Sequence, residues 1–364
     1  MTGKNRPRPS PSPAATPRMV RLSPPFGLCQ LFRPIPKDGA DRPTLNESLE
    51  YGDLTLRFSA REALAAPEQT LLLVLLELAQ EQHRRRPREH QLDRSDRTEI
   101  GALLWSSLHA GSLDQLADAP ATLMLNCSWS ELHRRCGSTS TGGAVTESRR
   151  ASLARLCEVT VWERIEATKT VRSCRLVSWL VGDDQRVHVA LNHRLASALL
   201  APGYAQVLLS ERLRLGSQTA MLIHAFLSTC LRHGKTITIG YETLVKRLWP
   251  CQGSATPAST HRRRLSDVRS ALRAIARLDH WAIELGTAMA SVTRTMPRMP
   301  VVPETPLRAS KTAPGTVPPG MPAREMTRTC HFRVPDASYV EHPFWPKPSR
   351  GGHLPRNDEA GTTL

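Results

Sequence analysis

Residues 259–279 read STHRRRLSDVRSALRAIARLD, and this stretch decides the fold of the region around it. Wound as an α-helix at about 100° per residue, it places its apolar residues and most of its arginines on opposite sides. The apolar side is formed by Leu265, Val268, Leu272 and Ile275. The polar side carries Arg262, Arg263, Ser266, Arg269, Ser270, Arg273 and Arg277, and Arg264 completes the six arginines. One side can pack on a core while the other meets phosphate, although a merely solvated basic face would have the same pattern.

The segments around this helix favour the first of these interpretations. Upstream, the pattern predicts a helix over 217–231, a β-branched strand over 236–239 and a second helix over 241–248, which ends at Trp249 and Pro250. Downstream, alternation from Trp281 to Val292 through Gly286 predicts a β-hairpin. This order is typical of a winged helix, a helix-turn-helix variant whose third helix enters the major groove. Lys246 on the second helix joins the candidate DNA contacts.

The preceding part of the chain repeats this order less clearly. Residues 128–135 predict a helix in which Ser128 is the N-cap and Glu131 has capping-box spacing. A helix over 146–157 offers Arg149, Arg150 and Arg155 as candidate DNA contacts, although Arg149 and Arg150 flank its apolar stripe. The other predicted elements are strands over 51–58, 123–125, 159–165, 171–181 and 187–191, a buried helix over 67–82 and a turn over 137–143.

The sequence therefore predicts an α+β protein with two tandem winged-helix domains. The first domain spans 23–201 and the second 202–295, joined through the stretch 193–206. Residues 1–22 form a basic arm rich in Pro and Ser, and residues 296–364 form a Pro-rich tail, and we expect both to be disordered.

Charge and composition favour a nucleic-acid partner. The 364 residues carry a formal net charge of +16, which comes from arginines spread along the whole chain. Such a field attracts polyanions. Only 5% of the residues are aromatic, which argues against base stacking as the main binding mode and favours double-stranded DNA.

Other classes of site find little support. The eight cysteines include no C-x-x-C pair, so we expect reduced thiols in the cytoplasm, no metal site and no cofactor. The most apolar run, LLLVLLEL at 71–78, is too short to span a membrane. Gly234-Lys235-Thr236 resembles the end of a P-loop but follows a helix instead of a strand. No motif for serine hydrolysis occurs, so no catalytic residue is predicted.

Several segments resemble the replication protein C initiators of IncQ-type plasmids. Three of these lie in the second unit, namely SQTAMLIHAFLS (217–228), GKTITIGYETLVKRLWP (234–250) and HRRRLSDVRSALRAIARLDHWAIEL (261–285), and VHVALNHRLASALL (187–200) directly precedes it. In the first unit they are YGDLTLRF (51–58) and NCSWSELHRRCGSTSTGG (126–143). The resemblance covers about residues 23–295 and implies tandem winged helices that bind direct repeats (iterons) at the plasmid origin and help to open it for a helicase and a primase. The two ends of the chain have no counterpart in this pattern.

Two other functions remain compatible with these residues. A transcriptional regulator could use the same two DNA-reading helices, because a fold does not fix a function. An enzyme that acts on DNA ends or primers would need a metal-dependent site, which no residue cluster predicts.

Overall fold

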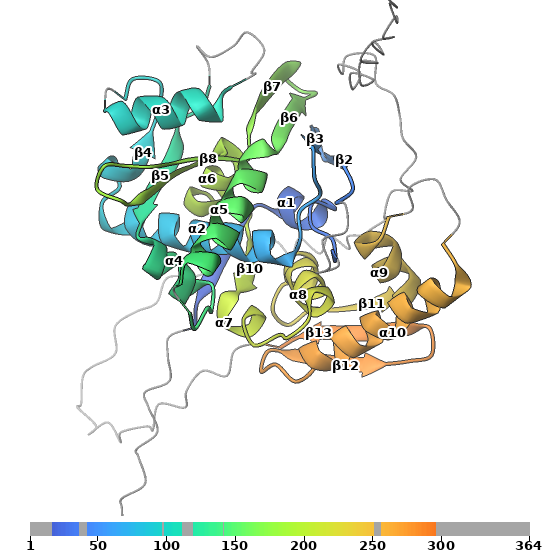
Figure 1. Cartoon of the computed structure of the whole chain (residues 1–364). Coiled ribbons are helices and arrows are strands. Elements are labelled where there is room, and N and C mark those ends of the chain that lie inside the picture. Colours follow the sequence, from blue (N-terminus) through green and yellow to red (C-terminus); the bar gives the residue numbers. More distant parts are fainter. Residues whose placement is uncertain are drawn as a thin grey trace, which may run out of the picture. The chain divides into compact units, whose positions relative to one another are not determined.

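The structure is a computed structural model that describes residues 17–35, 42–96, 98–110, 119–140, 142–250 and 256–295. The tail over 296–364 and nearly all of the arm, residues 1–16, lie outside the described residues. The fold is α+β, and all its named strand pairs are antiparallel in this part of the chain. The helices and strands of both predicted domains are drawn in Figure 1. One large hydrophobic core draws residues from both predicted domains.

The elements of the second predicted domain lie close to their expected positions. They are α8 (Gln218–Cys230), β11 (Thr236–Gly240), α9 (Tyr241–Leu248), α10 (Ala258–Ile275), β12 (Trp281–Leu285) and β13 (Met289–Arg294). The three strands form one sheet in the order β11-β13-β12. The predicted apolar stripe of α10 faces inward, with Val268, Leu272 and Ile275 buried and Leu265 half-buried.

The first predicted domain contains the same sequence of elements with insertions. The shared elements are α2 (Ala66–Arg85), β5 (Thr122–Cys127), α4 (Trp129–Arg135), α5 (Gly143–Glu158), β8 (Val177–Val181) and β9 (Val187–Leu191). As predicted, the Ser128 side chain caps α4 by accepting a hydrogen bond from the Glu131 N–H. The strands pair in the order β5-β9-β8, and the short β4 (Gln91–Leu92) pairs with the free edge of β5.

Two strand predictions in this region are corrected. The single strand expected over 171–181 is two strands, β7 (Thr170–Arg175) and β8, which belong to different sheets. Between them, the backbone of Leu176 forms hydrogen bonds with Val159 and Asn192. The strand expected over 51–58 is broken at Gly52, whose φ of +65° suits a tight turn between β2 (Leu45–Tyr51) and β3 (Leu54–Ala60). With β6 (Thr160–Ile165) these strands form the sheet β2-β3-β6-β7.

The ends of the predicted domains are more structured than the sequence indicates. The joining stretch over 193–206 contains α6 (His193–Leu200) and the start of β10 (Ala205–Leu208), which runs into α7 (Leu209–Arg212). The arm was expected to extend to Leu22, but Met19–Leu22 is strand β1, which pairs with β10. This prediction is corrected because Val20 and Leu22 are buried apolar residues. The remaining elements are α1 (Pro24–Leu28), the 3₁₀ turn Arg88–His90 and α3 (Glu99–Leu108).

Buried arginines connect the two predicted domains. Arg212 is fully buried and donates to Thr70 Oγ1 (3.1 Å), to the Ala66 carbonyl (3.1 Å) and to the Met221 carbonyl (2.5 Å). These acceptors lie on α2 and α8. The halves on either side of residue 201 therefore share a core and a set of buried hydrogen bonds.

Candidate nucleic-acid interface

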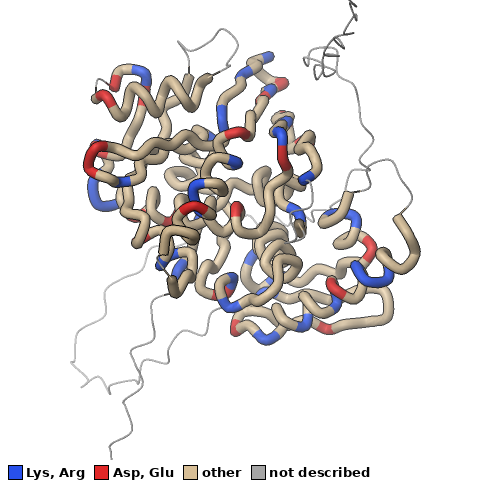
Figure 2. Tube along the Cα trace, viewed as in Figure 1, with Lys and Arg blue, Asp and Glu red and all other residues tan. Residues whose placement is uncertain are grey.

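Five of the six predicted arginines lie on α10, and the sixth, Arg277, lies in the turn just after it; four of the six are exposed. The helix packs its apolar side against α8 and α9, and its opposite side is exposed. Figure 2 marks its arginines in blue along the chain trace. None of the four forms an ion pair or a hydrogen bond with the rest of the described chain, so their guanidinium groups are available to a ligand. They are Arg262, Arg263, Arg273 and Arg277, and the exposed Ser266 and Ser270 lie on the same helix.

The other two arginines of α10 hold neighbouring elements in place. The Arg264 guanidinium lies over the Trp249 ring, 5.4 Å from its centroid. Arg269 lies 4.9 Å from the centroid of the Tyr241 ring and donates to the Thr287 carbonyl at 2.8 Å. Sequence reasoning grouped both with the free arginines, because their aromatic and carbonyl partners are far from them in the chain.

The hairpin turn between β12 and β13 is fixed beside α10. The Gly286 N–H donates to the Met289 carbonyl at 2.9 Å, which closes the turn. Tyr241, the first residue of α9, donates its hydroxyl to the Gly286 carbonyl (2.8 Å) and its N–H to the Ala288 carbonyl (3.0 Å). Together with the Arg269 bond, these contacts hold the hairpin turn and α10 as one surface.

A buried carboxylate links the same hairpin to the core. Glu211 accepts hydrogen bonds from His224 Nε2 (3.0 Å), His280 Nδ1 (2.5 Å) and Trp281 Nε1 (2.9 Å). Burial alone would raise the pKa of Glu211, but the hydrogen bonds from His224, Trp281 and His280 lower it to about 2. Glu211 therefore joins α7, α8 and β12 as an anion.

The three candidate arginines of α5 have different environments. Arg150 is exposed, and its guanidinium lies 5.4 Å from the centroid of the Trp129 ring. Arg149 is half-buried and donates to Ser138 Oγ at 3.1 Å. Arg155 forms an ion pair with the buried Glu68 at 2.7 Å, which occupies it inside the protein. Of the three, Arg150 is the most available to a ligand.

We expect Arg155→Ala to affect stability more than sequence recognition. Burial alone would raise the pKa of Glu68, but Arg42 and Arg155 hold it below its usual value, so the carboxylate is charged. Removing one partner of a buried charge is costly, and since Arg42 remains, we expect a loss of about 1–3 kcal/mol. Urea unfolding measures this change. A variant with unchanged stability but lost preference for one DNA sequence would contradict the structural role.

The two basic residues at the end of α9 also differ. Lys246 is exposed, as a DNA contact requires. Arg247 is packed on Phe226, 3.8 Å from the ring centroid, and donates to the carbonyls of Leu28 (2.6 Å) and Gly27 (2.8 Å) at the end of α1. Arg247 therefore anchors the N-terminal helix to the second predicted domain.

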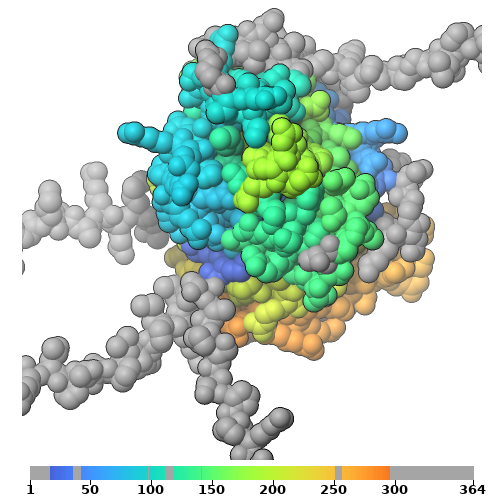
Figure 3. Space-filling model, turned by 60° about the vertical axis from the view of Figure 1, so that its left-hand side comes forward, coloured from blue at the N-terminus to red at the C-terminus, as the bar shows by residue number. Residues whose placement is uncertain are grey.

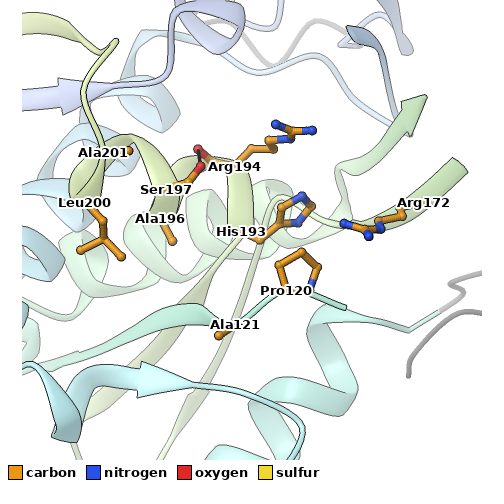
Figure 4. A pocket seen from close by; sticks show the side chains of 9 residues that line it. All are labelled: Pro120, Ala121, Arg172, His193, Arg194, Ala196, Ser197, Leu200 and Ala201. Atoms are coloured by element: carbon orange, nitrogen blue, oxygen red, sulfur yellow. Dashed lines mark hydrogen bonds between the residues drawn. The ribbon is translucent and has the colours of Figure 1, made fainter. Parts of the chain in front are cut away.

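A cleft of about 350 Å³ lies along α6 (Figure 4). Its polar end holds Arg172, His193 and Arg194, and its wall is apolar. Glu163 accepts from Arg194 Nε (2.7 Å) and His193 Nε2 (3.0 Å). Burial alone would raise the pKa of Glu163, but the Arg194 and His193 hydrogen bonds lower it to about 2. Arg194 and His193 therefore already have Glu163 as an anionic partner.

Three further features concern only the described residues. Six cysteines lie in these ranges, and all are free thiols. No group of three or more His, Cys, Asp or Glu side chains there is arranged to hold a metal ion. No helix in the same ranges is both long and apolar enough to cross a membrane.

The fold and the free arginines define a basic α+β protein with a helix-and-hairpin surface suited to a polyanion. The family model for replication protein C (RepC) matches residues 19–295. The chain belongs to the replication protein C family, as its sequence motifs predicted, and is thus a DNA replication protein. No curated protein matches the chain. A crystal structure described as domains 2 and 3 of RctB has a TM-score of 0.43 and 10% identity, over 76% of this chain and 100% of that chain.

Proposed function

We propose that this protein is a plasmid replication initiator that binds direct repeats (iterons) at the plasmid origin as duplex DNA. Two tandem winged helices read each repeat, with α10 and α5 in successive major grooves. Binding promotes opening of the adjacent DNA for a helicase and a primase. In this proposal the protein acts by binding and not by catalysis.

The observation that carries this proposal is the free arginine side of α10. Three exposed arginines without partners in the described chain lie on a helix whose opposite side is buried, and a fourth, Arg277, lies two residues beyond its end. Arginine is the side chain best suited to guanine edges and phosphates, because its fork donates two parallel hydrogen bonds. The hairpin turn held by Arg269 and Tyr241 lies where the wing of a winged helix would meet the DNA backbone.

The tandem arrangement is supported by the two sheets. In β5-β9-β8 and in β11-β13-β12, the third strand along the chain lies between the first and the second. In each case a helix precedes the first strand and two helices follow it. The same connectivity is repeated, so α5 and α10 occupy equivalent places. On α5, Arg150 is the proposed DNA contact, and on α9 it is Lys246.

Alanine substitution of the four free arginines on and just after α10 tests the proposal. A side chain that forks onto a guanine edge contributes sequence discrimination of about 1–3 kcal/mol, whereas a phosphate contact weakens all duplexes alike. We therefore expect Arg262→Ala, Arg263→Ala, Arg273→Ala and Arg277→Ala to divide into these two groups when each is titrated against a repeat and a scrambled duplex.

Arg232→Ala is the matched control. Arg232 is exposed and precedes β11, at the end of the sheet away from the hairpin turn. Its substitution should leave the affinity for both duplexes unchanged. Unchanged binding in all four arginine variants would contradict the assignment of α10 as a reading helix. Origin opening is tested separately by the reactivity of unpaired thymines, which a regulator of transcription would not increase.

A further inference from the structure

A dense cluster of arginines lies outside both proposed reading helices. The chain reads HRRRPREH over residues 83–90, where α2 ends. Arg84, Arg85, Arg86 and Arg88 are exposed, and we call residues 84–88 the basic turn. Within the described chain, its only ion pair joins Arg86 to Glu89 at 3.1 Å, with 70% and 60% of the two side chains exposed. An ion pair as exposed as this contributes little.

The basic turn is held beside the turn between β8 and β9. Gln82, in the last turn of α2, donates to the Asn126 carbonyl (2.6 Å) and accepts from the Asn126 N–H (3.1 Å). Arg186 donates to Asn126 Oδ1 from Nη2 (2.8 Å) and Nε (3.1 Å). Asn126 thus connects the end of α2 to residues 182–186, which we call the wing turn.

Strand β8, which leads into the wing turn, also contacts α5. Trp179 on β8 meets Trp129 edge to face with centroids 6.0 Å apart, and Arg150 of α5 lies over the Trp129 ring. Figure 3 looks onto this face: the yellow-green wing turn projects between the blue-cyan surface that follows α2 and the green surface of α4 and α5. A continuous series of contacts therefore joins the proposed reading helix to the basic turn.

The wing turn itself is a poor phosphate ligand. Asp183 and Asp184 are exposed at its tip. The Arg186 backbone N–H donates to Asp184 Oδ1 at 2.9 Å, and this bond lowers the pKa of Asp184, so the tip carries negative charge. Phosphates near this turn would be repelled by the aspartates and attracted by the arginines beside them.

We propose that the basic turn is a separate phosphate-binding site. It makes the contacts to the DNA backbone that the wing would otherwise make in the first winged-helix domain. Arg84, Arg85 and Arg88 contact phosphates of the duplex beyond the bases read by α5. These contacts do not depend on the DNA sequence. The helix dipole also favours arginines in the last turn of α2, but that effect falls off beyond the helix end at Arg85 and does not account for Arg88. The proposal rests on the proposed function, because it assumes that α5 faces duplex DNA.

Two triple variants of the full chain test it. The first, R84Q/R85Q/R88Q, removes three positive charges from the basic turn. The matched control, R61Q/R232Q/K235Q, removes three exposed charges that lie on neither proposed reading helix nor either turn. Each is titrated against a repeat duplex and a scrambled duplex at several salt concentrations, and the repeat complex is footprinted with hydroxyl radicals. Melting curves show whether each variant remains folded.

For the basic-turn variant, the plot of log association constant against log salt concentration should become less steep by about 2–3 units. Each lost phosphate contact reduces the steepness by about 0.9. Its footprint should shorten on one flank, with the ratio of repeat to scrambled affinity unchanged. The slope of the control should differ from that of the unsubstituted chain by less than about one. Its footprint should keep its full length. Equal slopes and footprints in the two variants would overturn the proposed phosphate site. They would point to an acidic protein surface as the ligand of the basic turn. Failure of the unsubstituted chain to prefer the repeat would instead contradict the proposed function.

Discussion

A chain shortened to residues 23–295 is expected to lose most of its stability, whereas one shortened to residues 17–295 keeps it. The four residues of β1 cause this difference. Val20 and Leu22 are 0% and 3% exposed, and β1 packs on α2 and α6 while it pairs with β10. Burying two such side chains contributes about 3–6 kcal/mol before the strand hydrogen bonds are counted. That is comparable with the whole stability of many domains, about 5–15 kcal/mol.

Thermal and urea unfolding of the two shortened chains measure this effect. The longer one also keeps Arg18, whose Nε donates to Glu77 Oε1 at 2.8 Å. A point variant separates loss of the strand from loss of length: in the longer chain, Val20→Asp places a charge in the core, whereas the neighbouring Met19→Gln changes a half-buried side chain. Equal melting of the 17–295 and 23–295 chains would show that β1 contributes nothing to the fold.

Glu211→Gln should be the most destabilising single substitution of a hydrogen-bonded side chain in the second predicted domain. The lowered pKa of Glu211, about 2 against an ordinary value of 4.5, means that its folded-state interactions favour the anion. Converted through the linkage between protonation and folding, this shift is worth about 3 kcal/mol. The amide of glutamine carries no charge and directs N–H donors toward a site where three donors converge.

The pH dependence of the same variant provides a second readout. Because the folded pKa is depressed, the stabilisation is fully present above about pH 4.5 and is lost as pH falls toward 2. The difference in unfolding free energy between the unsubstituted chain and Glu211→Gln should therefore be constant near neutral pH and shrink below pH 4.5. Glu242→Gln is the control, since Glu242 is exposed and bonds only to His261 within the described chain. A constant difference down to pH 3 would refute the assignment of the charge to Glu211.

The elements that were predictable are those whose information is local. The α10 stripe, the Ser128 cap and the helix over 241–248 each follow from residues within a few turns of one another. Strand β1 was missed because its four residues follow a basic arm, and its partner β10 lies more than 180 residues later. The break at Leu176 was missed because both flanking segments have strand composition, and only pairing with different sheets separates them.

The candidate site divides in the same way. The side of α10 that faces outward was predictable from periodicity, but the distinction among its arginines was not. Arg269 depends on Thr287 and Tyr241, and Arg155 depends on Glu68, which is 87 residues away. Periodicity assigns a side chain to a face; whether its charge is already neutralised depends on residues from other elements.

The shared core of the two predicted domains constrains the spacing of the DNA sites that they bind. Arg212 and the β1–β10 pair tie the two halves to each other by buried hydrogen bonds and strand pairing. In B-form DNA an inserted base pair turns everything beyond it by roughly a tenth of a revolution. Under the proposed function, one added base pair in the middle of a repeat would move its second half around the helix axis, away from the helix that reads it. The protein would then act as a molecular ruler, able to reject a correctly spelled repeat whose two halves are out of phase.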